Sequence, residues 1–181
     1  FFVWAPDSDG YAVETNAHNI YIYNYAPDPD MLYAAPGLSI DSGVDQAFQT
    51  TNAVTWAMNN EFWSLSATTN LTFSNADTIN VGTNDGTFYG VWRIQADTNG
   101  TVSTVAPATN QVYTTSTGAV AALPAASANN IGLGYVVVSA PTGTVFTANT
   151  SPLTGVSTFF DATPGTPAVQ TYELYVGGVA E

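Results

Sequence analysis

The regular alternation of short β-prone segments with turn residues most constrains what this chain can fold into. Segments rich in Val, Thr and aromatic residues, such as 87–96 and 131–140, are separated by turn sequences such as Asn59-Asn60 and Thr83–Gly86. Such spacing is typical of all-β domains, and Lys, Arg, Glu and Gln, which favour helices, are scarce. We therefore predict an all-β fold, either an antiparallel β-sandwich or a small barrel, with at most one helical turn at 119–123.

Two stretches carry the clearest strand signals. Residues 131–140 form the most apolar run of the chain, which is typical of a strand buried on both faces. Residues 53–58 and 61–66 flank Asn59-Asn60 and predict a hairpin, because Asn tolerates the positive φ angles of a two-residue turn. Further strands are predicted at 71–73, 78–81, 87–96, 101–105, 144–147 and 171–176.

The first 36 residues differ in composition from the rest and predict an N-terminal arm or an added β segment. Their first four residues include three large apolar side chains, which are costly in water unless they are buried. Residues 19–25 alternate with period two, so that three tyrosines share one face of a strand. We predict an arm at 1–36 and a β domain at 37–181, with the arm either folded onto its own domain or docked on a neighbouring subunit. The candidate subunit contacts are Phe1, Phe2, Trp4, Tyr21, Tyr23 and Tyr25.

The charge of the chain excludes several partners. The 181 residues include one basic side chain besides His18, which is Arg93, and the formal net charge is −13. Proteins bind nucleic acids through many Lys and Arg contacts to phosphates, so we predict no nucleic-acid partner. An anionic membrane surface is disfavoured for the same reason, and no stretch approaches the roughly 20 apolar residues of a membrane-spanning helix. Without cysteine, the fold has no disulfides.

The chain lacks the residue combinations of common catalytic centres. With no Cys and a single His, a Ser-His-Asp triad, a Cys–His pair or a zinc site has too few members. We predict that the protein is not an enzyme and that His18 is a polar surface or interface residue. No cofactor is predicted. Calcium is the one metal for which the acidic pairs are candidate ligands, because it is bound through oxygen atoms. These pairs are Asp7 with Asp9, Asp28 with Asp30, and Asp41 with Asp45.

The tryptophans leave two interpretations open. Trp56 and Trp63 flank the predicted hairpin, where cross-strand aromatic pairs are ordinary stabilisers, and Trp92 lies in the predicted strand 87–96. We expect these three side chains to pack in or near the core. The alternative is a glycan-binding surface on which these three residues and Trp4 supply the stacking faces.

An ordered set of segments extends over the central and C-terminal parts of the chain. They are Gly37–Ile40, Val54–Trp63, Ser66–Leu71, Val91–Asp97, Asn99–Val102, Ala122–Pro124, Ile131–Val138 and Phe146–Leu153. In this order and spacing they resemble a class of tailed-phage virion proteins found near capsid genes. The first 36 residues lie outside the resemblance, and Asn60 stands where the first hairpin turn of those proteins usually has Gly.

The resemblance implies a head decoration protein, a fibre or another surface component, usually oligomeric and without catalytic residues. We accordingly expect a virion structural protein that decorates the capsid or forms part of a surface fibre. Its expected partners are further copies of itself, preferably in a closed trimer, and the major capsid protein or a neighbouring virion protein. Two alternatives remain, a carbohydrate-binding β module and a cellular surface-layer or pilus-like subunit.

Overall fold

The computed structural model describes residues 12–13, 21–22, 30–59, 61–74, 78–80, 86–107 and 111–165. The chain divides into two compact units, residues 1–28 with 167–181 and residues 29–166. In the first unit, β1 (Ala12–Val13) pairs with β2 (Tyr21–Ile22) in antiparallel fashion. The second unit, called the β unit below, holds the other described elements.

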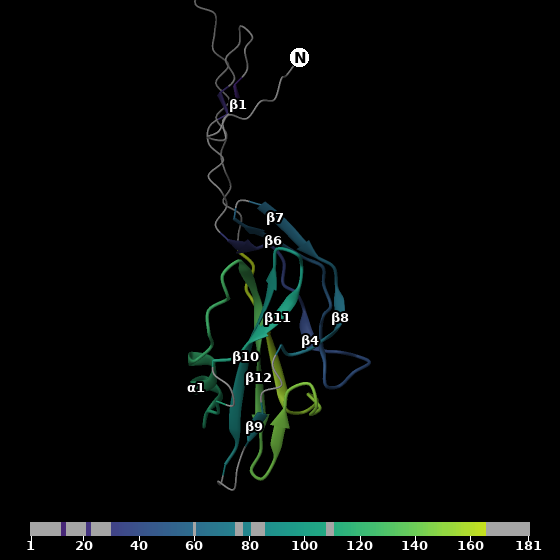
Figure 1. Ribbon diagram of the computed structural model, residues 1–181, viewed down its shortest axis with the longest axis vertical. Helices are drawn as coiled ribbons and strands as arrows, with labels where there is room; N and C mark the ends of the chain where they lie inside the picture. Colours follow the sequence, from purple (N-terminus) through teal and green to yellow (C-terminus); the bar gives the residue numbers. More distant parts are fainter. Residues whose placement is uncertain are drawn as a thin grey trace, which may run out of the picture. The chain divides into compact units, whose positions relative to one another are not determined.

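The largest sheet of the β unit has four antiparallel strands in the order β11-β10-β12-β14. Its two central strands, β10 and β12, run side by side along the β unit (Figure 1). The four strands are β10 (Phe88–Asp97), β11 (Val102–Val105), β12 (Asn130–Ala140) and β14 (Ser157–Asp161).

Three smaller antiparallel sheets complete the β unit, in the orders β3-β6-β7, β4-β5-β8 and β13-β9. Their strands are β3 (Met31–Leu32), β4 (Leu38–Ile40), β5 (Phe48–Thr50), β6 (Val54–Met58), β7 (Glu61–Leu65), β8 (Thr68–Leu71), β9 (Thr78–Asn80) and β13 (Val145–Thr147). Among the described residues, α1 (Ser116–Ala121) is the single helix. The prediction of an all-β fold is thus confirmed.

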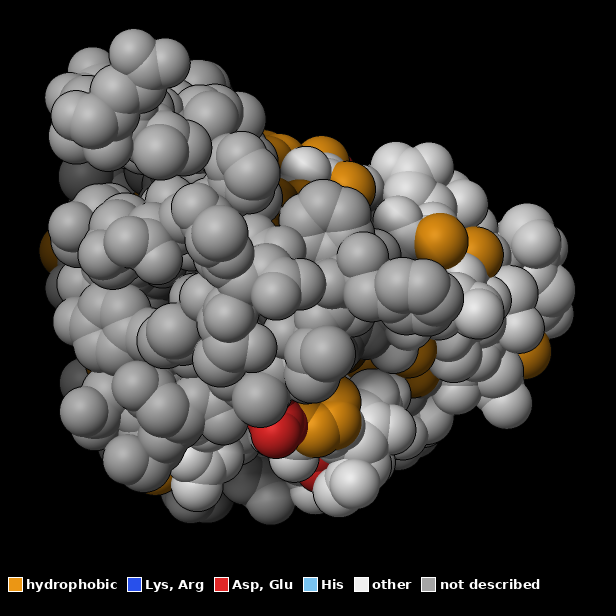
Figure 2. All heavy atoms as spheres, turned by 90° about the horizontal axis from the view of Figure 1, so that it is seen from above, with side chains coloured by type: hydrophobic (Ala, Val, Ile, Leu, Met, Phe, Trp, Pro, Cys, Tyr) orange, Lys and Arg blue, Asp and Glu red, His pale blue; other side chains and the backbone are white. Residues whose placement is uncertain are grey.

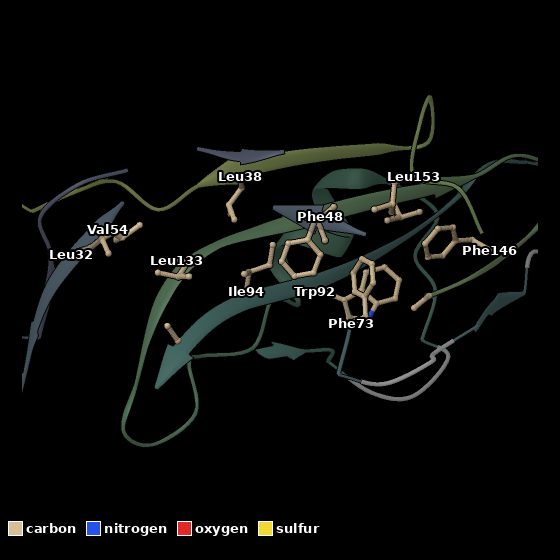
Figure 3. Packing of buried hydrophobic residues seen from close by; sticks show 14 of the residues in the cluster. Leu32, Leu38, Phe48, Val54, Phe73, Trp92, Ile94, Leu133, Phe146 and Leu153 are labelled. Atoms are coloured by element: carbon tan, nitrogen blue, oxygen red, sulfur yellow. The ribbon is translucent and has the colours of Figure 1, made fainter. Parts of the chain in front are cut away.

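The main core lies between the four-stranded sheet and the two three-stranded sheets, which fits a β-sandwich. Trp92 and Ile94 of β10 point into it, as does Phe48 of β5 (Figure 3). The ring of Phe73 bridges the two sides, with centroids 5.6 Å from Phe48 and 5.2 Å from Trp92. Aromatic pairs at these separations add to the stabilisation from buried area alone.

Strand β12 is buried on both faces, as its apolar run predicted. Val136 and Val138 belong to the main core, whereas Val137 packs in a second cluster on the opposite face with Val91 and Ala119. Side chains alternate across a strand, so a run without polar interruptions can supply two hydrophobic clusters at once.

The hairpin predicted around Asn59-Asn60 is also confirmed. Met58 pairs with Glu61, and Asn59 has a φ of 54°, the left-handed conformation that Asn tolerates. Trp56 lies opposite Trp63 in the register; Trp56 is fully buried, and Trp63 packs against the core. Trp92 is buried as well, so the expectation that the three tryptophans pack in or near the core is confirmed.

Several sequence predictions concern the ends of the β unit. The turn at 141–143 leads into β13 as predicted, but β13 pairs with β9 rather than folding back on β12. Within the predicted arm 1–36, β3 pairs with β6 of the β unit. The boundary at residue 36 otherwise stays a prediction. The strand at 171–176 and the residues 83–85 of the predicted turn lie outside the described residues.

Candidate functional site

The face of the four-stranded sheet that points away from the main core carries a surface groove. Tyr89, Val91 and Arg93 alternate on this face of β10. Helix α1 covers its middle, because Ala119 is fully buried and packs with Val91 and Val137. We call this the outer face.

Local hydrogen bonds hold α1 in place. Tyr89 and Tyr113 exchange main-chain hydrogen bonds of 2.8 and 2.9 Å just before the helix. The hydroxyl of Thr115 then caps the helix by accepting from the Gly118 main-chain N–H at 3.0 Å. Past the helix, Arg93 donates through Nε to the carbonyl of Pro124. The segments before and after α1 are therefore both hydrogen-bonded to strand β10.

A groove of about 440 Å³ lies beside α1, toward the edge strand β14. This volume falls within the roughly 300–1,000 Å³ of typical ligand pockets. None of the residues that line it carries a charge. The site, called the α1 groove below, is defined by Tyr89, Val120, Val137, Ser139, Thr158 and Phe160.

An aromatic pair adjoins the α1 groove through Phe160, which is one of its lining residues. Tyr135 and Phe160 stand opposite each other in the β12–β14 register, and their rings stack with centroids 4.7 Å apart at 15°. Phe160 is 41% exposed, although it is a large apolar side chain. Arg93 extends the same row on β10, and partial burial lowers the pKa of its guanidinium. The outer face thus presents stacked rings beside a neutral hollow.

A second groove, the β7 groove, lies on the β3-β6-β7 sheet. Its volume is about 420 Å³, and it is lined by Tyr33, Thr55, Phe62, Trp63 and Ser64. Phe62 is 65% exposed, the highest value among the large apolar side chains described, and its ring centroid lies 5.9 Å from that of Tyr33. In the view of Figure 2, hydrophobic side chains reach the surface of the described residues at several places, and no Lys or Arg side chain is visible.

The acidic pair Asp41 and Asp45 is engaged in hydrogen bonds that stabilise loops. The carboxylate of Asp41 accepts main-chain N–H bonds from Gly43 at 2.7 Å, Val44 at 3.0 Å and Asn70 at 2.6 Å. Asp45 accepts from the main chain and the hydroxyl of Thr154. Within the described ranges, no three His, Cys, Asp or Glu side chains are grouped so as to hold a metal ion. Asp7, Asp9 and Asp28 lie outside those ranges.

The hydrogen bonds at Asp41 predict a loss of stability in acid. The main-chain bond from Asn70, followed by that from Gly43, holds the pKa of Asp41 below its ordinary value. A carboxyl whose pKa is lower in the folded state stabilises the fold above its unfolded pKa of about 3.9, and this contribution is lost as the pH falls through the folded pKa. We expect the urea midpoint of the wild type to fall below about pH 4.

The matched variant Asp41→Asn cannot ionise. It should have a lower urea midpoint near neutral pH, because the charged acceptor is lost, and a smaller further fall on acidification. The measurement is urea unfolding followed by circular dichroism at several pH values. Equal acid sensitivity in the two proteins would contradict this assignment.

The predicted subunit contacts fall almost entirely outside the part of the chain that the structure describes. Phe1, Phe2, Trp4, Tyr23 and Tyr25 lie outside the described residues, as does His18. Tyr21 belongs to β2, where its backbone pairs with Val13. Sequence reasoning missed Phe62 and Phe160; the signal for the latter was the β-prone run 157–161, which forms β14.

Comparison of the chain with protein-family models, with curated proteins and with solved structures found no match. Among the described residues, no helix has the length and apolar character needed to cross a membrane. The candidate site therefore stands on its geometry and chemistry.

Proposed function

We propose that this protein is a structural component of a virion surface, which decorates the capsid or contributes to a surface fibre by packing against other subunits. The observation that carries the packing role is the presence of two neutral grooves, each beside an exposed phenylalanine, on separate sheets. The virion setting is supported by the resemblance of residues 38–160 to tailed-phage surface proteins.

The chemistry of the two surfaces suits association with another protein. Exposed aromatic side chains are enriched at interfaces, whereas charged residues are depleted from interface centres. Phe62 and Phe160 supply such rings, and each adjoins a hollow that could receive a partner side chain. Further copies in a closed trimer, and a capsid or neighbouring virion protein, remain the proposed partners. The aromatic segment from Phe1 to Trp4 is proposed as an additional contact.

Sedimentation at two salt concentrations tests the packing role. Each copy carries a formal charge of −13, so copies repel one another at low ionic strength. If neutral apolar surfaces hold the subunits together, the wild type should sediment as an oligomer that is more stable at high salt than at low salt. Deleting residues 1–4 in the same assay shows whether the arm contributes. A protein that remains monomeric at every concentration would refute the packing role.

A carbohydrate-binding module is the second candidate, favoured by one feature of the α1 groove. The stacked pair Tyr135–Phe160 lies near the hydroxyl-bearing residues Ser116, Thr117 and Thr158, and sugars are commonly held between aromatic faces and hydroxyl groups. A stable monomer that binds glycans on an array, with loss of binding in Phe160→Ser, would establish this function instead.

A further inference from the structure

We propose that the α1 groove is a self-association site, in which Phe160 of one copy enters the groove of a second copy across a two-fold axis while the reverse contact forms at the same time. This inference rests on the proposed packing role and names the surface and the occupant. This two-fold contact is separate from the interfaces that hold the subunits of a trimer together. It can therefore join two single subunits or two trimers.

The first support is the placement of the projecting ring and the hollow on one face. Phe160 of β14 is 41% exposed and lines the groove together with Val137 and Thr158, which are paired in the β12–β14 register. A two-fold contact requires a surface that is complementary to itself. A ring next to a hollow meets that requirement, because rotation by 180° brings each ring to the partner's hollow.

The second support is charge. Two copies with a net charge of −13 each repel one another. The repulsion is smallest where the surfaces that meet carry no ionised groups. No charged residue lines the groove. The acid nearest in sequence, Asp161, follows Phe160, so its side chain leaves the strand on the other face. There its carboxylate accepts main-chain N–H bonds from Gly37 at 3.2 Å and Leu38 at 2.7 Å.

The third support is the chemistry of the lining, which favours an apolar ring over a sugar. The polar groups of the lining residues are hydroxyls, and that of Ser139 already donates to the carbonyl of Val156 at 3.2 Å. Carboxylate, amide and guanidinium groups, which can bond two neighbouring sugar hydroxyls at once, are missing from the lining. Apolar walls from Val120 and Val137 suit a phenyl ring, whose burial releases water from both surfaces.

The first test compares two exposed apolar side chains. Phe160→Ser should halve the sedimenting mass of the wild-type assembly, whether that is a dimer or a pair of trimers, and weaken the two-fold association by about thirtyfold. Val145→Ser is the matched control, because Val145 is 54% exposed, belongs to the β13-β9 sheet and lines neither groove. It should leave this association unchanged. Both side chains are exposed, so both variants are expected to fold, which circular dichroism checks.

A second measurement does not depend on removing the ring. Since the chain has no cysteine, Thr158→Cys introduces one thiol into the lining of the groove, and Thr55→Cys introduces one into the β7 groove as a control. A short bis-maleimide linker should join two copies of Thr158→Cys much faster than two copies of Thr55→Cys.

The outcomes separate this inference from the packing role. An oligomer whose mass is unchanged in Phe160→Ser, or equal cross-linking of the two cysteine variants, overturns the α1-groove contact and leaves the packing role standing. A wild type that is monomeric throughout overturns both. Halved mass in Phe160→Ser with selective cross-linking at position 158 supports the contact.

Discussion

Replacing Trp92 with Ala is expected to lower the free energy of unfolding by about 3–5 kcal/mol, the usual cost of truncating a buried aromatic side chain. Trp92 is 2% exposed and sits where both sides of the sandwich meet. Its ring centroid lies 5.2 Å from that of Phe73 and 5.9 Å from that of Phe146. Phe73 is itself fixed, because the side chain of Asn149 accepts from its N–H at 2.7 Å and donates to its carbonyl at 2.8 Å. The neighbours therefore have little freedom to close the cavity.

Two further variants make the measurement specific. Trp92→Phe keeps an aromatic ring and removes Nε1–H, a buried donor that has no hydrogen-bond partner in the structure. It should cost about 1–3 kcal/mol, less than Trp92→Ala, because the cavity that it leaves is smaller. Phe62→Ala, on the exposed surface, should change stability by about 0.5 kcal/mol or less. Urea unfolding followed by circular dichroism suits all three proteins. A loss below about 1 kcal/mol in Trp92→Ala would show that this ring does not join the two sides of the core.

Local rules explain the parts of the fold that the sequence predicted well. The Asn59 turn and the apolar run of β12 each depend on residues close together in the chain, and so does the turn at 97–100 that the structure shows. In the last of these, Asp97 accepts main-chain N–H bonds from Asn99 and Thr101, both at 2.8 Å, and Gly100 has a φ of 75°. Such Asx turns are determined within a few residues, so a sequence is enough to place them.

The strand partners could not be predicted, because they depend on contacts between distant residues. Ser74 and Thr104 illustrate this: each main-chain N–H donates to the hydroxyl of the other residue at 2.8 Å, across 30 positions. No periodicity reveals such a pair. The same holds for the pairing of β13 with β9, for which the sequence offered only two short β-prone segments.

The candidate site was missed for the same reason. The α1 groove combines side chains from β10, α1, β12 and β14, and it exists only when these elements pack together. Composition drew attention instead to the aromatic residues before position 26. What the sequence does show is that no large basic surface can form, since the chain has a single Arg and no Lys.

Gly134→Ala is expected to destabilise the β unit by about 2–6 kcal/mol, from two causes of about 1–3 kcal/mol each. The first is conformation: Gly134 has a φ of +148°, which side-chain-bearing residues rarely adopt. The second is space. A Cβ atom on Gly134 would lie 2.2 Å from the carbonyl oxygen of Phe160, 2.6 Å from Leu38 Cδ1 and 3.1 Å from the nitrogen of Ala162. Two of these atoms belong to the backbone and cannot turn away.

Gly86→Ala separates the two causes. Gly86 has a similar φ of +140°, but a Cβ added there would meet no atom within 4 Å. Its replacement should therefore show the conformational cost alone, about 1–3 kcal/mol. The difference between the two variants in urea unfolding then measures the clash with Phe160, Leu38 and Ala162. Because β14 also carries Phe160, a displaced strand should reduce cross-linking through a cysteine at position 158 in Gly134→Ala but not in Gly86→Ala. Equal losses of stability in the two variants would show that β14 can move aside freely, and the groove would then lack the rigid rim on which its role depends.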